Sequence, residues 1–232
     1  MPGARQTSIP SWRRHDLLHV APDVWALALA HCTSLADLPL VGSWADRGWP
    51  VIVRRRGEAE DPGSVPVGLP LPPALGKHRV ALLLPPDGVL HRSYPPSLRA
   101  AAKVAHPGWR STMALLLALG ERMGVEPSAF GSLLWQHRTG LTYLSPHSDL
   151  DLLWPVPAGF DVLSLVFGIA ELQRDAALRI DGEIVFPDGS AVNWRELWMA
   201  HRAGDRASVL VKTMEGIRLL DFASLPGVGQ HA

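Results

Sequence analysis

The stretch that decides the fold runs from residue 130 to residue 153: it opens with Phe130-Gly131-Ser132 and ends with Ser148-Asp149-Leu150-Asp151-Leu152-Leu153. The closing segment is typical of a β-strand, in which alternate side chains point to opposite faces. Asp149 and Asp151 then share one face, and the leucines share the other. Two carboxylates this close repel each other, and a bound Mg²⁺ ion would remove that repulsion because it prefers oxygen ligands. A solvated strand edge with two surface acids is the alternative interpretation.

Gly131-Ser132 stands at a predicted strand-to-helix junction, because an apolar segment precedes it and a helix-compatible run follows it. Backbone N–H groups and a hydroxyl at a helix N-terminus form an anion-binding site. A phosphate site beside a metal-binding acid pair is the outline of a phosphoryl-transfer site. The order Gly-Ser, helix, Asp-x-Asp strand resembles the nucleotidyltransferase superfamily, which shares its catalytic domain with polymerase β.

The composition indicates a globular protein with a sizeable core, since 47% of the 232 residues are hydrophobic and 19% are charged. Basic and acidic residues number 22 each, which argues against a nucleic-acid polymerase and its basic phosphate track. Cys32 is the single cysteine, so no intrachain disulfide framework exists and a reducing cytoplasm is expected. No signal peptide and no apolar run of about 18 residues is evident, so we expect no membrane partner.

Tyr94-Pro95-Pro96 marks the predicted boundary between two domains, residues 1–95 and 96–232. The first is predicted to be a small β-rich domain with one main helix, and the prolines of residues 65–73 argue against a central strand there. The second is predicted to be an α+β domain, a mixed sheet with helices packed on one face. Its expected helices are 97–105, 109–123, 160–174 and 194–201, and its expected strands are 125–130, the Asp-x-Asp segment, 177–186, 191–194 and the hairpin 208–213 with 217–220.

A third acid is available on the predicted strand 177–186. Asp181 lies on the polar face of this strand and can enter the site, with Glu183 as the neighbouring alternative. Asp181-Gly182 is also compatible with a turn or a bulge. Lys212, on the predicted hairpin, either meets phosphate or faces water, and the loop residue His147 is interpreted as a surface residue.

Basic residues cluster in the first domain. The clusters include Arg54-Arg55-Arg56, in which only Arg54 and Arg56 share a strand face, and Lys77-His78-Arg79. Arginine forks suit phosphate oxygens, so Arg54 and Lys77 are candidate ligands of a polyphosphate substrate. The alternative is that these side chains solvate strand ends and loops.

A longer set of motifs, spread in order over nearly the whole chain, resembles one family. These motifs are Arg14-His15-Asp16-Leu17, Gly48-Trp49-Pro50, Val53-Arg54-Arg55, Gly68-Leu69-Pro70-Leu71-Pro72-Pro73, Gly76-Lys77, Phe130-Gly131-Ser132, Trp135-Gln136, Thr139-Gly140-Leu141, Ser148-Asp149-Leu150-Asp151-Leu152-Leu153, Asp181-Gly182-Glu183, Trp194-Arg195-Glu196-Leu197 and Val211-Lys212-Thr213. The family is the malonate decarboxylase holo-acyl-carrier-protein synthase, a phosphoribosyl-dephospho-coenzyme-A transferase.

The resemblance implies a reaction in which a serine hydroxyl of the carrier subunit attacks the α-phosphorus of 2'-(5''-triphosphoribosyl)-3'-dephospho-coenzyme A and pyrophosphate leaves. Mg²⁺ held by Asp149 and Asp151, phosphates held by Gly131 and Ser132, and a serine activated by Asp181 fit that chemistry. Two other function classes are compatible with the sequence: a nucleotidyltransferase acting on another small-molecule or protein acceptor, and an inactive binding module that keeps the nucleotide pocket.

Overall fold

The computed structural model describes residues 12–30, 38–76, 78–204 and 206–228. The chain divides into two compact units, residues 1–69 with 79–94 and residues 70–78 with 95–232. Residues 70–78 belong with the second unit although they interrupt the first. The Tyr143 hydroxyl donates to the carbonyl oxygen of Pro70 at 3.0 Å, and this bond fastens the segment to the second unit.

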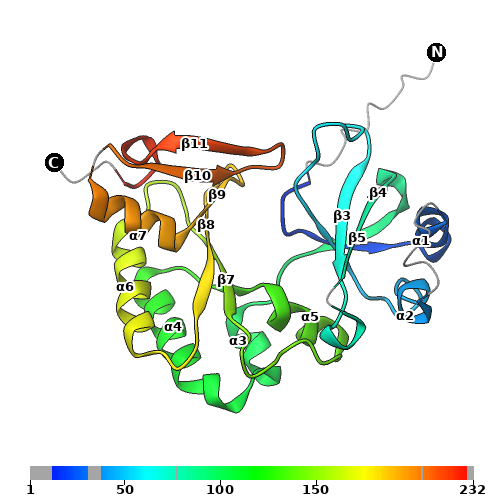
Figure 1. Cartoon of the computed structure of the whole chain (residues 1–232), viewed down its shortest axis with the longest axis horizontal. Coiled ribbons are helices and arrows are strands. Elements are labelled where there is room, and N and C mark those ends of the chain that lie inside the picture. Colours follow the sequence, from blue (N-terminus) through cyan, green and yellow to red (C-terminus); the bar gives the residue numbers. More distant parts are fainter. Residues whose placement is uncertain (1–11, 31–37, 77, 205, 229–232) are drawn as a thin grey trace. The chain divides into compact units, whose positions relative to one another are not determined.

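The first unit is built on a five-stranded sheet with the strand order β4-β3-β2-β1-β5. The pairs β1–β2, β1–β5 and β2–β3 are antiparallel. The β-rich structure and the main helix predicted for this part of the chain are present. The elements are β1 (Leu17–Val20), α1 (Pro22–Leu29), α2 (Pro39–Gly42), β2 (Val51–Val53), β3 (Val65–Pro70), β4 (Arg79–Leu84), the short 3₁₀ turn Pro86–Gly88 and β5 (Val89–Ser93) (Figure 1).

The proline-rich segment forms β3, an interior strand, so the expectation that its prolines exclude a central strand is wrong. The pairing between β3 and β2 is confined to Val67 and Gly68, and the prolines at 66 and 70 lie outside it. Pro66 still accepts a hydrogen bond through its carbonyl oxygen, from the Arg54 N–H at 3.0 Å. Proline removes only a donor, and these two prolines stand where β2 has already ended.

The second unit is an α+β structure with a six-stranded mixed sheet, as predicted. The strand order is β11-β10-β9-β8-β7-β6, and β7–β8 pair in parallel while the other pairs are antiparallel. The helices α4, α6 and α7 lie together beside this sheet in Figure 1. The elements are α3 (Leu98–Ala101), α4 (Arg110–Met123), β6 (Ser128–Ala129), α5 (Gly131–Thr139), β7 (Leu150–Pro155), α6 (Val162–Asp175), β8 (Ile180–Val185), β9 (Ala191–Asn193), α7 (Trp194–Ala203), β10 (Ser208–Lys212) and β11 (Ile217–Asp221).

The hydrophobic core of the second unit fixes which face of the central strands is polar. Leu150, Leu152 and Trp154 of β7 are fully buried, as are Ile180 and Ile184 of β8. They pack in one core with apolar residues of α4, α6 and α7. Because strand side chains alternate, burying this set turns the intervening acidic residues to the opposite face. No helix in the described part of the chain is long and apolar enough to span a membrane.

Candidate active site

Three aspartates come together where β7 and β8 begin. Asp151 and Asp181 are partners in the parallel register of these strands, so their side chains leave the same face. Asp149 stands immediately before β7 and has the same parity as Asp151. The guanidinium of Arg179 lies between two of the acids, with Nε 3.7 Å from Asp149 Oδ2 and a terminal nitrogen 3.6 Å from Asp181 Oδ2. The structure therefore places the predicted acids on one polar face.

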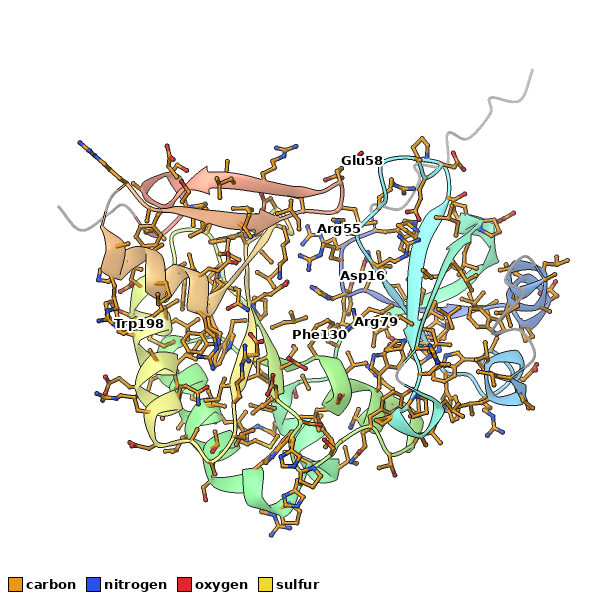
Figure 2. The ribbon with its side chains drawn as sticks, in the orientation of Figure 1. Asp16, Arg55, Glu58, Arg79, Phe130 and Trp198 are labelled. Carbon is orange, nitrogen blue, oxygen red and sulfur yellow. The ribbon has the colours of Figure 1, made fainter. Side chains whose placement is uncertain are left out.

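Helix α5 begins directly against the acid site. Phe130, labelled in Figure 2, is its N-cap residue and donates its N–H to the carbonyl oxygen of Asp151 at 3.0 Å. Gly131 follows with φ of +56°, and a Cβ built on it would lie 2.0 Å from Asp151 Oδ2. Only glycine fits both the left-handed backbone and this close approach. The predicted Gly131-Ser132 junction therefore lies beside the Asp151 carboxylate, with Ser132 half-buried in the first turn.

Asp181 is held by two donors on one of its oxygens. Oδ1 accepts the Gly182 N–H at 2.7 Å and the Asn193 side-chain amide at 2.8 Å. The other oxygen, Oδ2, is the one that lies near Arg179. Gly182, at φ of +145°, has no space for a side chain, because a Cβ there would lie 2.0 Å from the Leu152 carbonyl oxygen. The β8 strand thus presents Asp181 in a fixed orientation and is not a turn or a bulge at this point.

Asn193 is a site residue that the sequence analysis missed. Its side-chain oxygen accepts the Arg195 N–H at 2.8 Å and caps α7, while its amide nitrogen donates to Asp181. An asparagine before a helical segment is a recognisable N-cap signal. The second bond was not predictable, because it depends on β9 lying next to β8 in the sheet.

Glu183, the alternative third acid, has a different environment. It is buried, with 8% of its surface exposed, and Lys212 Nζ donates to its Oε1 at 2.7 Å. Lys212 is therefore an ion-pair partner of Glu183, a role that neither sequence interpretation of this lysine included. Its predicted contact with phosphate stays a prediction. The pairing favours Asp181 over Glu183 as the acid that meets substrate.

Arg195 contacts the first residue of β8. A terminal nitrogen of its guanidinium donates to Gln173 Oε1 at 2.5 Å and to the Ile180 carbonyl oxygen at 2.8 Å. Its guanidinium carbon lies 4.5 Å from the ring centre of Trp194. Burial, and then the positive charge of Arg179, lowers the pKa of Arg195. Two arginines thus lie near the start of β8: Arg195, which is held by hydrogen bonds, and Arg179, which is exposed.

Arg54, a predicted substrate residue, has its described partners within the first unit. Arg54 donates to both Glu60 oxygens, at 2.9 and 2.5 Å, and to the Val67 carbonyl oxygen at 3.1 Å. The hydrogen bond from Arg54 lowers the pKa of Glu60 to about 2. These contacts favour a structural role for Arg54, and its role in binding substrate stays a prediction. Lys77 lies outside the described residues, and His147 is exposed.

The metal prediction depends on the pair Asp149 and Asp151. Among the residues whose positions are described, no group of three or more histidine, cysteine, aspartate and glutamate side chains forms a set that could hold a metal ion. The donors present nevertheless fit Mg²⁺ in kind, because both are carboxylates on one face. A positive group, Arg179, already lies against one of these carboxylates and against Asp181. These contacts show a positively charged partner at the acids, and the binding of Mg²⁺ there stays a prediction.

Comparisons with known proteins agree over most of the chain. Residues 97–223 match the family described as phosphoribosyl-dephospho-CoA transferase MdcG C-terminal domain, and residues 13–95 match the corresponding N-terminal domain. A phosphoribosyl-dephospho-CoA transferase of Bradyrhizobium diazoefficiens is 40% identical over 90% of this chain and 89% of its own length. One from Xanthomonas campestris is 38% identical over 91% and 95%, and one from Pseudomonas aeruginosa is 33% identical over 75% and 79%. No solved structure matches.

Proposed function

The chain belongs to the phosphoribosyl-dephospho-CoA transferase family and is a transferase, and from this premise we propose which group it moves and to what. The donor is 2'-(5''-triphosphoribosyl)-3'-dephospho-coenzyme A. The acceptor is a serine of the acyl carrier protein subunit of malonate decarboxylase. The serine oxygen forms a bond to the α-phosphorus, the bond from that phosphorus to the bridging oxygen breaks, and pyrophosphate leaves with that oxygen.

The observation that carries this proposal is the register of Asp151 with Asp181. It puts two carboxylates on the same sheet face from different strands, so that one can serve as general base for the hydroxyl while the other helps to hold a metal ion. Asp181 Oδ1 is occupied by the Gly182 and Asn193 donors. Its Oδ2 is the oxygen that would accept the proton of the serine hydroxyl as the new phosphorus–oxygen bond forms.

The donor's phosphates would lie at the start of α5. Gly131 approaches the Asp151 carboxylate closely, and the N–H groups of the first turn together with the Ser132 hydroxyl supply hydrogen-bond donors there. Asp149 and Asp151 would hold a divalent cation, for which we propose Mg²⁺, and when bound it would neutralise charge on the triphosphate and on the leaving pyrophosphate. The chain's own task is to bind the phosphates, orient them and accept the serine proton.

Transfer of label tests the proposal. The protein is incubated with donor labelled in its dephospho-CoA part and with the unmodified carrier subunit, or with a carrier whose acceptor serine is alanine. We expect label on the first carrier only, with one pyrophosphate released for each label. Label on a small molecule or on a different protein would instead support a superfamily member with another acceptor. Donor binding without any transfer would support an inactive binding module.

A further inference from the structure

We propose that Arg179 is a positioning residue that occupies the acid site before the cation and the donor arrive, and then turns to the donor's triphosphate. In this account Arg179 and the divalent cation compete for the Asp149 carboxylate, which belongs both to the proposed metal pair and to the Arg179 ion pairs. The second half of the inference rests on the proposed function, whereas the competition with the cation does not depend on which group is transferred.

The geometry points to an exchangeable contact. Arg179 approaches Asp149 to 3.7 Å and Asp181 to 3.6 Å, which are ion-pair distances and longer than hydrogen bonds. Its side chain is 58% exposed, so water screens both contacts. Such pairs are weak and compete poorly with a divalent ion on the Asp149 carboxylate. The Arg179 side chain can therefore leave the acids at little cost.

The backbone of Arg179 is tied to the start of β7, whereas its side chain is exposed. Its carbonyl oxygen accepts the Leu150 N–H at 2.8 Å, beside the start of β7. Behind it stands Arg195, whose guanidinium is bound to Gln173 and to the Ile180 carbonyl oxygen. The like charge of Arg195 disfavours any position of the Arg179 side chain close to it and favours positions over the acids. When a cation takes the acids, Arg179 is repelled from there as well.

The negative charge of a triphosphate would offset the repulsion of Arg179 by Arg195 and by the bound cation. A guanidinium offers five N–H donors in a planar fork that matches phosphate oxygens, and it stays charged at any working pH. The anchored backbone keeps the released side chain within reach of whatever is bound over Asp149 and Asp181. Arg179 would therefore raise the affinity for the donor in the presence of the cation and lower the affinity for the cation in the absence of the donor.

Opposite effects of one substitution test the inference. The first effect is on the affinity for the cation in the absence of donor. We measure it by titrating the protein with Mn²⁺ alone, followed by calorimetry or by electron paramagnetic resonance of the unbound ion. We expect Arg179→Gln to bind Mn²⁺ about two- to fivefold more tightly than wild type, since exposed ion pairs are worth little each. Steady-state transfer assays measure the second, and we expect the KM for the donor to rise about tenfold while kcat changes less.

Two further variants serve as controls. Arg174→Gln removes another exposed arginine, which lies on α6 and pairs with Glu171, and should leave both the Mn²⁺ affinity and the KM unchanged. Arg179→Lys keeps the positive charge but loses the planar guanidinium. Its Mn²⁺ affinity should therefore be as low as that of wild type, whereas its donor affinity should lie between those of Arg179→Gln and wild type. Mn²⁺ affinity that Arg179→Gln leaves unchanged or lowers would overturn the competition. Tighter Mn²⁺ binding with an unaltered KM would overturn the role toward the donor. Failure of the wild-type protein to transfer the group would overturn the proposed function and with it the role toward the donor, whereas the Mn²⁺ titrations would still decide the competition.

Discussion

The backbone of Gly131 lies so close to the Asp151 carboxylate that a Cβ on the glycine would be 2.0 Å from Oδ2. This contact joins the first turn of α5 to the acid face of β7. It fixes the distance between the start of the helix, where we propose that phosphate binds, and the acids. The spacing between this proposed phosphate site and the acid pair therefore depends on the absence of one methyl group.

Gly131→Ala should reduce transfer by at least about a hundredfold, because the Cβ must displace either the helix start or the Asp151 carboxylate. Gly140→Ala is the matched control: it lies at the other end of α5 with φ of +72° and nothing within 4 Å of its Cβ position. Both variants carry the strain of a left-handed non-glycine residue. Thermal unfolding and transfer rates are measured for both, and equal rates in the two variants would contradict the account.

Asp149→Asn and Asp151→Asn should each abolish transfer and leave the melting temperature nearly unchanged. Neither side chain belongs to the hydrophobic core, and each change removes a negative charge from a site proposed to hold a cation. Mn²⁺ titration should show weaker binding in both variants. Near-normal turnover in either would rule out the proposed metal pair.

Asp181→Ala should lower kcat by about 10² to 10⁴-fold, the usual contribution of a general base. Glu183→Ala should act mainly on stability. It removes the buried carboxylate that Lys212 Nζ contacts at 2.7 Å, so the lysine loses its ion-pair partner. The comparison of kcat with melting temperature separates the two acids. A large loss of kcat in Glu183→Ala at an unchanged melting temperature would reassign the third acid.

Asn193→Ser should lower kcat about tenfold at a small cost in stability. Serine can still cap α7, since it is a good N-cap residue, but it is too short to replace the amide that donates to Asp181 Oδ1. Asn193→Ala loses both bonds and should also lower the melting temperature. If both variants keep the wild-type kcat, Asn193 does not orient Asp181 for catalysis.

Arg54 and Glu60 should make the stability of the first unit depend on acidic pH. The pKa of Glu60 is lowered to about 2, first by the Arg54 hydrogen bond, so the pair stabilises the fold above the ordinary glutamate pKa. This contribution is lost as the pH falls from about 5 through about 2. Glu60→Gln should therefore be less stable than wild type at pH 6, and the difference should shrink by pH 2 to 3 in urea unfolding experiments.

The same pair tests the predicted substrate role of Arg54. Its contacts within the first unit lead us to expect that Arg54→Ala and Glu60→Gln both lower stability. If Arg54 also binds substrate, as predicted, Arg54→Ala alone should raise the KM for donor or carrier. A KM unchanged in both variants would leave Arg54 with a structural role only.

The fold of the second unit was largely predictable because its signals are local. Apolar alternation marked β7 and β8, and a glycine followed α4 at its end. The prolines of β3 led to the wrong prediction that no interior strand forms there. Whether a proline excludes a strand from a sheet depends on how far the neighbouring strand extends. The acidic residues could be identified in the sequence, but their proximity depends on the register between β7 and β8. Partners such as Lys212 with Glu183 come from strands far apart in sequence, which no local pattern encodes.

The intact mass of the carrier subunit tests the central claim most directly. The purified protein, the triphosphoribosyl donor, Mg²⁺ and unmodified carrier are incubated together, and carrier mass and released pyrophosphate are followed in the same sample. With the wild-type protein we predict that the carrier gains the mass of one phosphoribosyl-dephospho-CoA group on its serine as one pyrophosphate appears, and that Asp151→Asn gives neither. A carrier of unchanged mass with the wild-type protein, or equal modification by Asp151→Asn, would contradict the account.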